Sequence, residues 1–294
     1  ATESIAGNTP KDVYYFAGDA KNNWVKFGGF YWRIIRTNSD GSIRLLYSGT
    51  SPDTTSGYIG TSKFNATYND NDPIKDPMYV GYMYGTTGSL ENNRLNTNDS
   101  RIKKYIDNWY KNNLTAYTKY LSKDAVYCND RELAPGSTYN TGKTIFYYAS
   151  YGRLYTNKTP TYNCTNIKDA FSGSNSEAKL TYPIGLMTAD EIAYAGGKEN
   201  TKLPSPYAWY YTNANGESIT GSTYLLTLSP DRWTGSYLFI WRVEASAYPG
   251  YLDNNFVDSS AGVRPAISLK TCTLWTSGNG APETPYEIST TSGC

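Results

Sequence analysis

Residues 30–49, FYWRIIRTNSDGSIRLLYSG, restrict the fold of this chain more than any other segment. Two runs rich in aromatic and β-branched residues flank the turn sequence TNSDG, in which Gly41 can adopt a positive φ. This pattern predicts a β-hairpin with apolar side chains on both faces. One face would carry Trp32, Ile34, Ile43 and Leu45, and the other would carry Ile35 and Leu46. Because both faces are apolar, we expect the hairpin to lie inside a larger sheet.

Two segments have the signals of α-helices. The segment Ser100–Leu114 starts with a potential N-cap serine and has apolar residues at 102, 105, 106 and 109, the spacing of one helical face. Its Trp109 is expected in the core, as is Trp32 of the hairpin. In residues 186–197, LMTADEIAYAGG, Thr188 and Glu191 match a capping box, and Gly196 can end the helix in a left-handed conformation.

The rest of the chain predicts short strands and long loops. Residues 50–95 are rich in Gly, Asp, Asn, Pro and Tyr without periodicity, which is typical of a long loop. Four later segments predict strands: PYAWYYT at 206–212, STYLLTLSP at 222–230, GSYLFIWRVEA at 235–245 and GVRPAISL at 262–269. Pro265 restricts the last of these to an edge strand or makes it a strand start. We therefore predict one α+β domain with short antiparallel strands, two main helices and long loops.

Composition excludes several classes of function. The chain has no histidine, which rules out Ser-His-Asp triads, Cys-His dyads and histidine-bearing zinc sites. Lysine and arginine number 27 and aspartate and glutamate 26, without a basic stripe, so we expect no nucleic-acid partner. No apolar run approaches the roughly 20 residues of a membrane span. The chain is therefore not expected to be an enzyme or to cross a membrane.

Carboxylates are the remaining candidates for catalysis. An Asp/Glu pair acting on sugars is an alternative, but the spacing does not select two partners among the acids considered, which are Asp53, Asp190, Glu244 and Asp253. Asp190 and Glu191 are adjacent in a predicted helix, where neighbouring side chains point apart, and capping accounts for Glu191. We rank catalysis last.

Four cysteines, with no CxxC motif, favour disulfides over a metal site. Three pairings are possible; we favour Cys128 with Cys164 and Cys272 with Cys294, because each pair closes a local loop. On the chain-entropy model each closure stabilises the fold by roughly 3 to 4 kcal/mol. Disulfides indicate an oxidising, extracellular location. The polar start at Ala1 suggests a mature chain whose export segment has been removed.

Several separated phrases together resemble one family. They are YYFAGDAKNNWVKFGGFYWRIIRTNSDGSIRLLYSG, DNWYKNNL, YCNDRE, Cys164 followed by KDAF, LTYPIGLMTADEIAYAGG, the LSP of STYLLTLSP, SAGVRPAISLK and SGNGAPETPYEI. In this order, from about Val13 to Ile288, they are similar to a domain of unknown function in exported proteins of Firmicutes and related gut bacteria, many of which have a pilin-like export segment.

This resemblance implies a C-type-lectin-like fold, related in outline to formylglycine-generating enzymes, and it supports the pairing of Cys128 with Cys164. We expect an N-terminal lead at 1–12, the lectin-like domain at 13–270 and a disulfide-closed tail at 271–294. The EPN and WND motifs of animal C-type lectins are absent, so no cofactor is expected, and calcium is possible without being indicated by a motif. An activity does not follow from such a fold.

The segment SPDRWTGSYLFIWRVEASAYPGYLDNN, residues 229–255, has the composition of a binding surface, because aromatic residues and arginine dominate interface energies. The predicted ligand-binding residues are Trp233, Tyr237, Trp241, Arg242, Tyr248, Tyr251, Asn254 and Asn255. Some of its aromatic rings should alternate into the core. The members of the predicted loop, Tyr248, Tyr251, Asn254 and Asn255, should be more exposed than Leu238 and Ile240.

The leading hypothesis is a non-catalytic surface protein of a bacterium that binds a host glycan or a host protein, as an adhesin does. The alternative is the head or a subunit of a pilus or surface filament, in which case other subunits would be partners.

Overall fold

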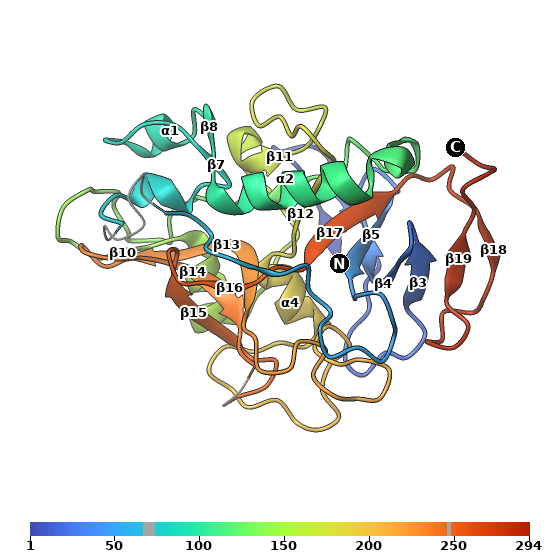
Figure 1. Cartoon of the computed structure of the whole chain (residues 1–294). Coiled ribbons are helices and arrows are strands. Elements are labelled where there is room, and N and C mark those ends of the chain that lie inside the picture. Colours follow the sequence, from blue (N-terminus) through green and yellow to red (C-terminus); the bar gives the residue numbers. More distant parts are fainter. Residues whose placement is uncertain (67–73, 246–247) are drawn as a thin grey trace.

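The computed structural model describes residues 1–66, 74–245 and 248–294 of the chain. It shows an α+β protein with two main sheets, which confirms the predicted class. In Figure 1 a six-stranded sheet lies on the left and a seven-stranded sheet on the right, and helix α2 (Arg101–Asn113) crosses above them. Residues 67–73 of the predicted long loop and residues 246–247 of the 229–255 segment lie outside the described residues.

The seven-stranded sheet is built around the predicted hairpin, which consists of β4 (Phe30–Thr37) and β5 (Ile43–Tyr47). The strands follow the order β12-β17-β5-β4-β3-β19-β18. Gly41 has a φ of 84° in the turn, as the sequence predicts. Ile43 differs from the prediction, since it is 38% exposed next to the turn, opposite Thr37. The other strands are β3 (Trp24–Phe27), β12 (Ile184–Leu186), β17 (Pro265–Leu269), β18 (Trp275–Ser277) and β19 (Tyr286–Ile288).

The six-stranded sheet follows the order β15-β14-β13-β16-β6, with β10 paired to β13 as well. Its strands are β6 (Thr61–Ser62), β10 (Phe146–Tyr147), β13 (Leu225–Trp233), β14 (Leu238–Val243), β15 (Leu252–Phe256) and β16 (Ala261–Gly262). The register between β13 and β14 shifts on both sides of Pro230. Asp231 is an extra residue of the second shift, because Pro230 opposes Ile240 while Arg232 opposes Phe239. Such a bulge re-aims side chains.

Both predicted helices are present. Helix α2 has Ser100 as its N-cap, and α4 (Ala189–Ala195) has the complete Thr188–Glu191 capping box and ends at Gly196 with a φ of 118°. The buried face of α2 is centred on Ile102, Ile106 and Tyr110, whereas Trp109 is only partly buried. Trp109 therefore packs at the rim of the core, and Trp32 is fully buried, as predicted.

Several shorter elements complete the chain, and some divide the predicted loop at 50–95. The helical turns are α1 (Leu90–Asn93), α3 (Ala149–Tyr151), η1 (Pro77–Val80), η2 (Thr115–Tyr120), η3 (Gly152–Asn157) and η4 (Ile167–Asp169). Three short strand pairs are β1 (Thr2–Glu3) with β2 (Lys11–Asp12), β7 (Met83–Tyr84) with β8 (Asn98–Asp99), and β9 (Tyr127–Cys128) with β11 (Ala170–Phe171).

One of the four strand predictions needs correction. Residues 206–212 form a turn-rich segment and not a strand. Buried guanidinium groups hold this segment: Arg33 Nη1 donates to the carbonyl of Thr212 at 3.2 Å, and Arg264 Nη1 donates to the carbonyl of Tyr210. Of the two alternatives for Pro265, the strand start is confirmed: β17 begins at Pro265 and lies between β12 and β5, so it is not an edge strand. A proline at the first position removes no hydrogen bond from the strand interior.

The two ends of the chain join the body of the protein. Disulfides link Cys128 with Cys164 and Cys272 with Cys294, which confirms both predicted pairs. The tail adds β19 and β18 to the sheet, since β19 pairs in parallel with β3. In the N-terminal lead, Glu3 is buried and contacts Arg36 at 2.8 Å. Among the described residues, no helix has the length and apolar character that crossing a membrane requires.

Candidate functional site

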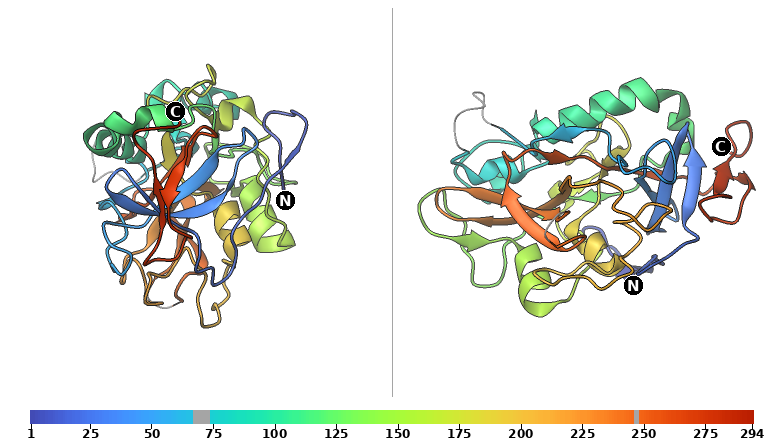
Figure 2. Two further views of the ribbon diagram at one scale, coloured as in Figure 1. Left: turned by 90° about the vertical axis from the view of Figure 1, so that its right-hand side faces the viewer. Right: turned by 60° about the horizontal axis from the view of Figure 1, so that its bottom comes forward.

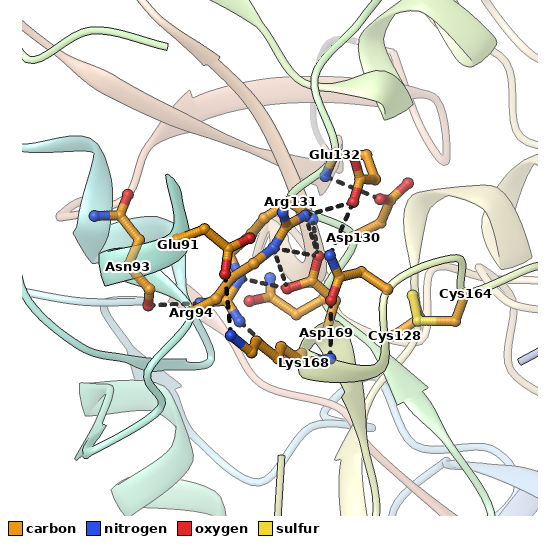
Figure 3. Close-up of polar contacts among 12 residues, drawn as sticks. Glu91, Asn93, Arg94, Cys128, Asp130, Arg131, Glu132, Cys164, Lys168 and Asp169 are labelled. Carbon is orange, nitrogen blue, oxygen red and sulfur yellow. Dashed lines mark hydrogen bonds and ion pairs between the residues drawn. A yellow bond between two sulfur atoms is a disulfide. The ribbon is translucent and has the colours of Figure 1, made fainter. Parts of the chain in front are cut away.

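Charged side chains gather in the interior around Asp169. Its carboxylate accepts from Arg94 Nη2 and from Arg131 Nε, each at 2.7 Å, and from the backbone amide of Arg131 at 2.9 Å. Figure 3 shows this cluster next to the disulfide between Cys128 and Cys164. The YCNDRE segment therefore supplies an arginine whose donors are satisfied inside the protein. This is the arrangement that a buried ion pair requires for stability.

A second set of buried charges surrounds the start of α4. Glu191 accepts from Arg44 Nη1 at 2.7 Å and from Arg36 Nε at 2.9 Å, while its neighbour Asp190 pairs with Arg153 at 2.9 Å. Burial acts to raise the pKa of Glu191, but Arg44 and Arg36 outweigh it and hold that pKa below its usual value. Between these groups lies a cavity of only about 20 Å³. The adjacent carboxylates thus face different arginines, and the space between them is about the size of one water molecule.

A more open surface lies on one face of the six-stranded sheet. Residues that oppose each other in neighbouring strands share a face, and four such residues form a row across β10, β13, β14 and β15. The row consists of Tyr147, Arg232, Phe239 and Phe256, all of them partly exposed. The guanidinium carbon of Arg232 lies 4.5 Å from the ring centre of Phe239, within the range of a cation–π contact.

Further aromatic rings extend this row at both ends. Tyr151 stacks on Tyr147 with ring centres 4.2 Å apart, and Tyr155 stacks on Tyr151 at 4.9 Å. At the other end, Tyr237 packs 4.9 Å from Phe256. We call this continuous surface the aromatic face. It comprises Tyr147, Tyr151, Tyr155, Arg232, Tyr237, Phe239, Asn254 and Phe256.

Polar groups fix the arginine of the aromatic face. Arg232 Nη1 contacts Asp231 Oδ2 at 2.8 Å, and Arg232 Nη2 donates to Asn254 Oδ1 at 3.2 Å. Asp231 is fully buried in the bulge of β13, and within the described structure its Oδ1 has no hydrogen-bond partner. Burial raises the pKa of Asp231 to about 7, with Arg232 acting in the opposite direction and Glu199 and Asp253 adding to the rise.

A cleft of about 310 Å³ adjoins the aromatic face. We call it the Glu199 cleft; its lining includes Leu154, Lys158, Pro160, Ala193, Glu199 and Leu252. Glu199 forms a parallel bridge with Leu252 of β15 and contacts Lys158 Nζ at 3.7 Å. Lys158 also lies 5.6 Å from the ring centre of Tyr155. Ring contacts therefore connect the cleft to the aromatic face without interruption.

Two of the eight predicted ligand-binding residues belong to the core, and their placement on a binding surface was wrong. Trp233 is 1% exposed and Trp241 is 0% exposed. Trp233 Nε1 donates to the carbonyl of Gly142 at 2.9 Å, and Trp241 Nε1 donates to Ser150 Oγ at 3.1 Å. Trp241 points to the same side as the aromatic face but lies under α3, because Ser150 belongs to that turn.

The structure separates the six remaining predicted residues. Tyr237, which is 49% exposed, and Asn254 lie on the aromatic face. Arg242 and Asn255 have the opposite parity and point to the other side of the sheet. Tyr248 and Tyr251 pack against each other with ring centres 5.4 Å apart, on the turn that joins β14 to β15. The predicted contrast in exposure is confirmed, since Leu238 and Ile240 are each 1% exposed.

Sequence reasoning missed most of the aromatic face. Tyr147, Tyr151 and Tyr155 recur every four residues, a spacing that places side chains on one side of a helical turn and could have been recognised. Phe239 lies in the segment 229–255 but was not among the predicted ligand-binding residues. The bulge at Asp231 has no signal in the sequence, because it depends on how β13 and β14 pair.

Among residues 1–66, 74–245 and 248–294, no group of three or more acidic or cysteine side chains could hold a metal ion. Comparison of the chain with protein-family models, curated proteins and solved structures returns no match.

Proposed function

We propose that this chain is an exported, non-catalytic surface protein that binds a host glycan or a host protein through its aromatic face. One observation carries the proposal: the cross-strand row of Tyr147, Arg232, Phe239 and Phe256, extended by stacked tyrosines. Rigid aromatic rings and arginine provide large contact areas at little cost in side-chain entropy. This surface is partly exposed, whereas the charged groups around Asp169 and Glu191 are paired with one another inside the protein.

Two further observations support the extracellular and non-catalytic parts of the proposal. Both disulfides fit an oxidising compartment. Three of the four acids considered for catalysis form ion pairs: Asp190 with Arg153 at 2.9 Å, Asp253 with Arg242 at 2.7 Å and Glu244 with Arg242 at 3.8 Å. These pairs give the three carboxylates a structural role.

The proposal includes membership of the exported-protein family and its C-type-lectin-like fold. The hairpin of β4 and β5, the capped helix α4 and the disulfide between Cys128 and Cys164 all fall within the phrases that carry the resemblance. A structure of a family member determined by experiment, superposed on this chain, would test the assignment.

An array of host glycans and host surface proteins tests the function, with and without calcium. The parent chain should bind a defined subset of spots, and the double variant Tyr151→Ala, Tyr237→Ala should lose more than about 1 kcal/mol of binding free energy. Trp275→Ala is the matched control, because Trp275 is 64% exposed on β18, at the other end of the molecule (Figure 1).

The comparison is valid only if the parent, the double variant and Trp275→Ala unfold at the same melting temperature. Equal binding by the parent and the double variant would contradict the proposal. Filaments formed by the purified chain, without binding to the array, would instead favour the alternative of a filament subunit.

A further inference from the structure

We infer that the aromatic face and the Glu199 cleft form one extended site for a linear, uncharged oligosaccharide. This inference rests on the proposed binding function and names the class of ligand. It commits the ligand to a chain of several sugar units that lies across the strands, rather than to a single terminal sugar.

The aromatic face and the Glu199 cleft are continuous with each other. From the row on the sheet, the tyrosine stack leads through Tyr151 to Tyr155, and Lys158 lies over Tyr155 and lines the cleft. The strand β15 makes a second connection, because it contains both Asn254 of the aromatic face and Leu252, which lines the Glu199 cleft. In Figure 2 (right) the turn formed by α3 and η3 lies beside the strands of this sheet.

The aromatic face is longer than a single sugar ring. Neighbouring strands lie about 4.8 Å apart, so the row from Tyr147 to Phe256, which crosses three strand spacings, is roughly 14 Å long. The stack to Tyr155 and the ring of Tyr237 extend it further. One sugar ring covers only a part of such a surface, and a linear chain can use all of it.

Chemistry favours a carbohydrate. A pyranose presents an apolar C–H face, which packs on aromatic rings, and a rim of hydroxyl groups, which need hydrogen-bonding partners. The surface provides both kinds of contact: rings such as Tyr151 and Phe239, and polar groups between them, the guanidinium of Arg232, the amide of Asn254 and the carboxylate of Glu199.

Pairing of charges favours an uncharged chain. Arg232 lies 2.8 Å from Asp231, and Lys158 lies 3.7 Å from Glu199. An anionic ligand would have to compete with these carboxylates, and a cationic ligand would have to compete with the two cations. A neutral sugar can accept and donate hydrogen bonds while both pairs persist.

A peptide strand is less suited to this place. Peptides that extend a sheet need a free strand edge. At the cleft, the edge of β15 is already covered, because Leu252 donates to the carbonyl of Lys198 at 3.0 Å and accepts from Asn200 at 3.4 Å.

Size-graded oligomers of chitin, cellulose and poly-N-acetyllactosamine test the inference by isothermal titration. For the series that binds, affinity should rise about tenfold or more from the disaccharide to the pentasaccharide. Tyr155→Ala should remove most of this rise, whereas Tyr155→Phe should retain it because the ring is kept. Trp275→Ala should behave as the parent does.

Each other outcome is decisive. If oligosaccharides bind with the same affinity at every length, the extended neutral site is wrong while the binding function stands. If the array shows protein ligands only and no oligomer binds, the inference fails and the proposed function survives. If the array and the oligomers both show no binding, the proposed function fails as well.

Discussion

Individual residues show two different uses of charge in this protein. Arg94, Arg131 and Glu191 are buried, each contacts more than one oppositely charged or polar group, and they hold separate segments of the chain together. Asp231 is buried as well, but it has one neighbouring cation and, in the described part of the chain, an Oδ1 atom without a hydrogen bond. An incompletely satisfied carboxylate costs stability, and such residues often mark functional surfaces.

The pH dependence of stability should reveal this cost at Asp231. Its pKa is raised from 3.8 to about 7, so between these values the folded state binds a proton that the unfolded chain has released. The free energy of unfolding should therefore fall as the pH rises from about 4 to about 7. Over the full interval between the two pKa values, the free energy of unfolding should fall by roughly 4 kcal/mol.

Asp231→Asn removes the titrating group while keeping the shape of the side chain. The variant should show a fall that is smaller than that of the parent by roughly 2 to 4 kcal/mol, measured by urea unfolding at several pH values between about 4 and about 8. Parallel curves for the two proteins would show that Asp231 does not carry a raised pKa.

The secondary-structure elements differ in how clearly their local sequences predict them. The hairpin of β4 and β5 and the helices α2 and α4 each have local signals, a turn glycine or a capping residue, and all three are predicted nearly to their ends. Residues 206–212 have the composition of a strand, but the hydrogen bonds from Arg33 and Arg264 override that preference. Those arginines come from distant parts of the chain, so no local pattern could reveal the outcome.

The aromatic cluster between the hairpin and α2 provides a test at this scale. Trp32 is fully buried, with its indole N–H donating to the carbonyl of Phe27 at 3.0 Å, while Trp109 keeps part of its surface exposed. Trp32→Ala should therefore cost about 3 to 5 kcal/mol of stability. Trp109→Ala should cost about 1 to 2 kcal/mol less, because less apolar surface leaves the core. Urea unfolding of both variants measures the difference, and equal losses would show that Trp109 is as deeply packed as Trp32.

At the scale of the whole molecule, the two disulfides close loops in different settings. Cys164 is fully buried and pairs with Ile5 of the N-terminal lead, whereas the bond between Cys272 and Cys294 closes the exposed tail. The chain-entropy model gives about 4 kcal/mol for the closure of 36 residues and about 3 kcal/mol for that of 22.

Replacing both Cys128 and Cys164 with alanine should consequently destabilise the protein more than replacing Cys272 and Cys294. The difference in stability between the two double variants should be larger than the difference between the two loop-closure entropies. The reason is that removing the first disulfide also removes contacts of the buried Cys164. Thermal unfolding of the two double variants under non-reducing conditions measures it. A larger loss from the tail variant would mean that the attachment of β19 to β3 depends on the disulfide more than the body of the protein does.

The site was less predictable than the fold because long-range contacts decide which aromatic rings are exposed. The segment 229–255 was identified as rich in interface residues, and it contributes Arg232, Tyr237, Phe239 and Asn254 to the aromatic face. Which of its rings are exposed depends on α3, which covers Trp241, and on the pairing of β10 with β13, which brings in Tyr147. Both are long-range contacts that a linear reading does not contain.

The most direct test of the binding assignment is hydroxyl-radical footprinting of the protein with and without the glycan or protein that binds best on the array. Oxidation should fall at Tyr151, Tyr155, Tyr237 and Phe256 in the complex, because the ligand covers those rings. Oxidation at Trp275, which is on β18, should not change. Protection at Trp275 with undiminished oxidation of the four face residues would show that the aromatic face is not the ligand-binding surface.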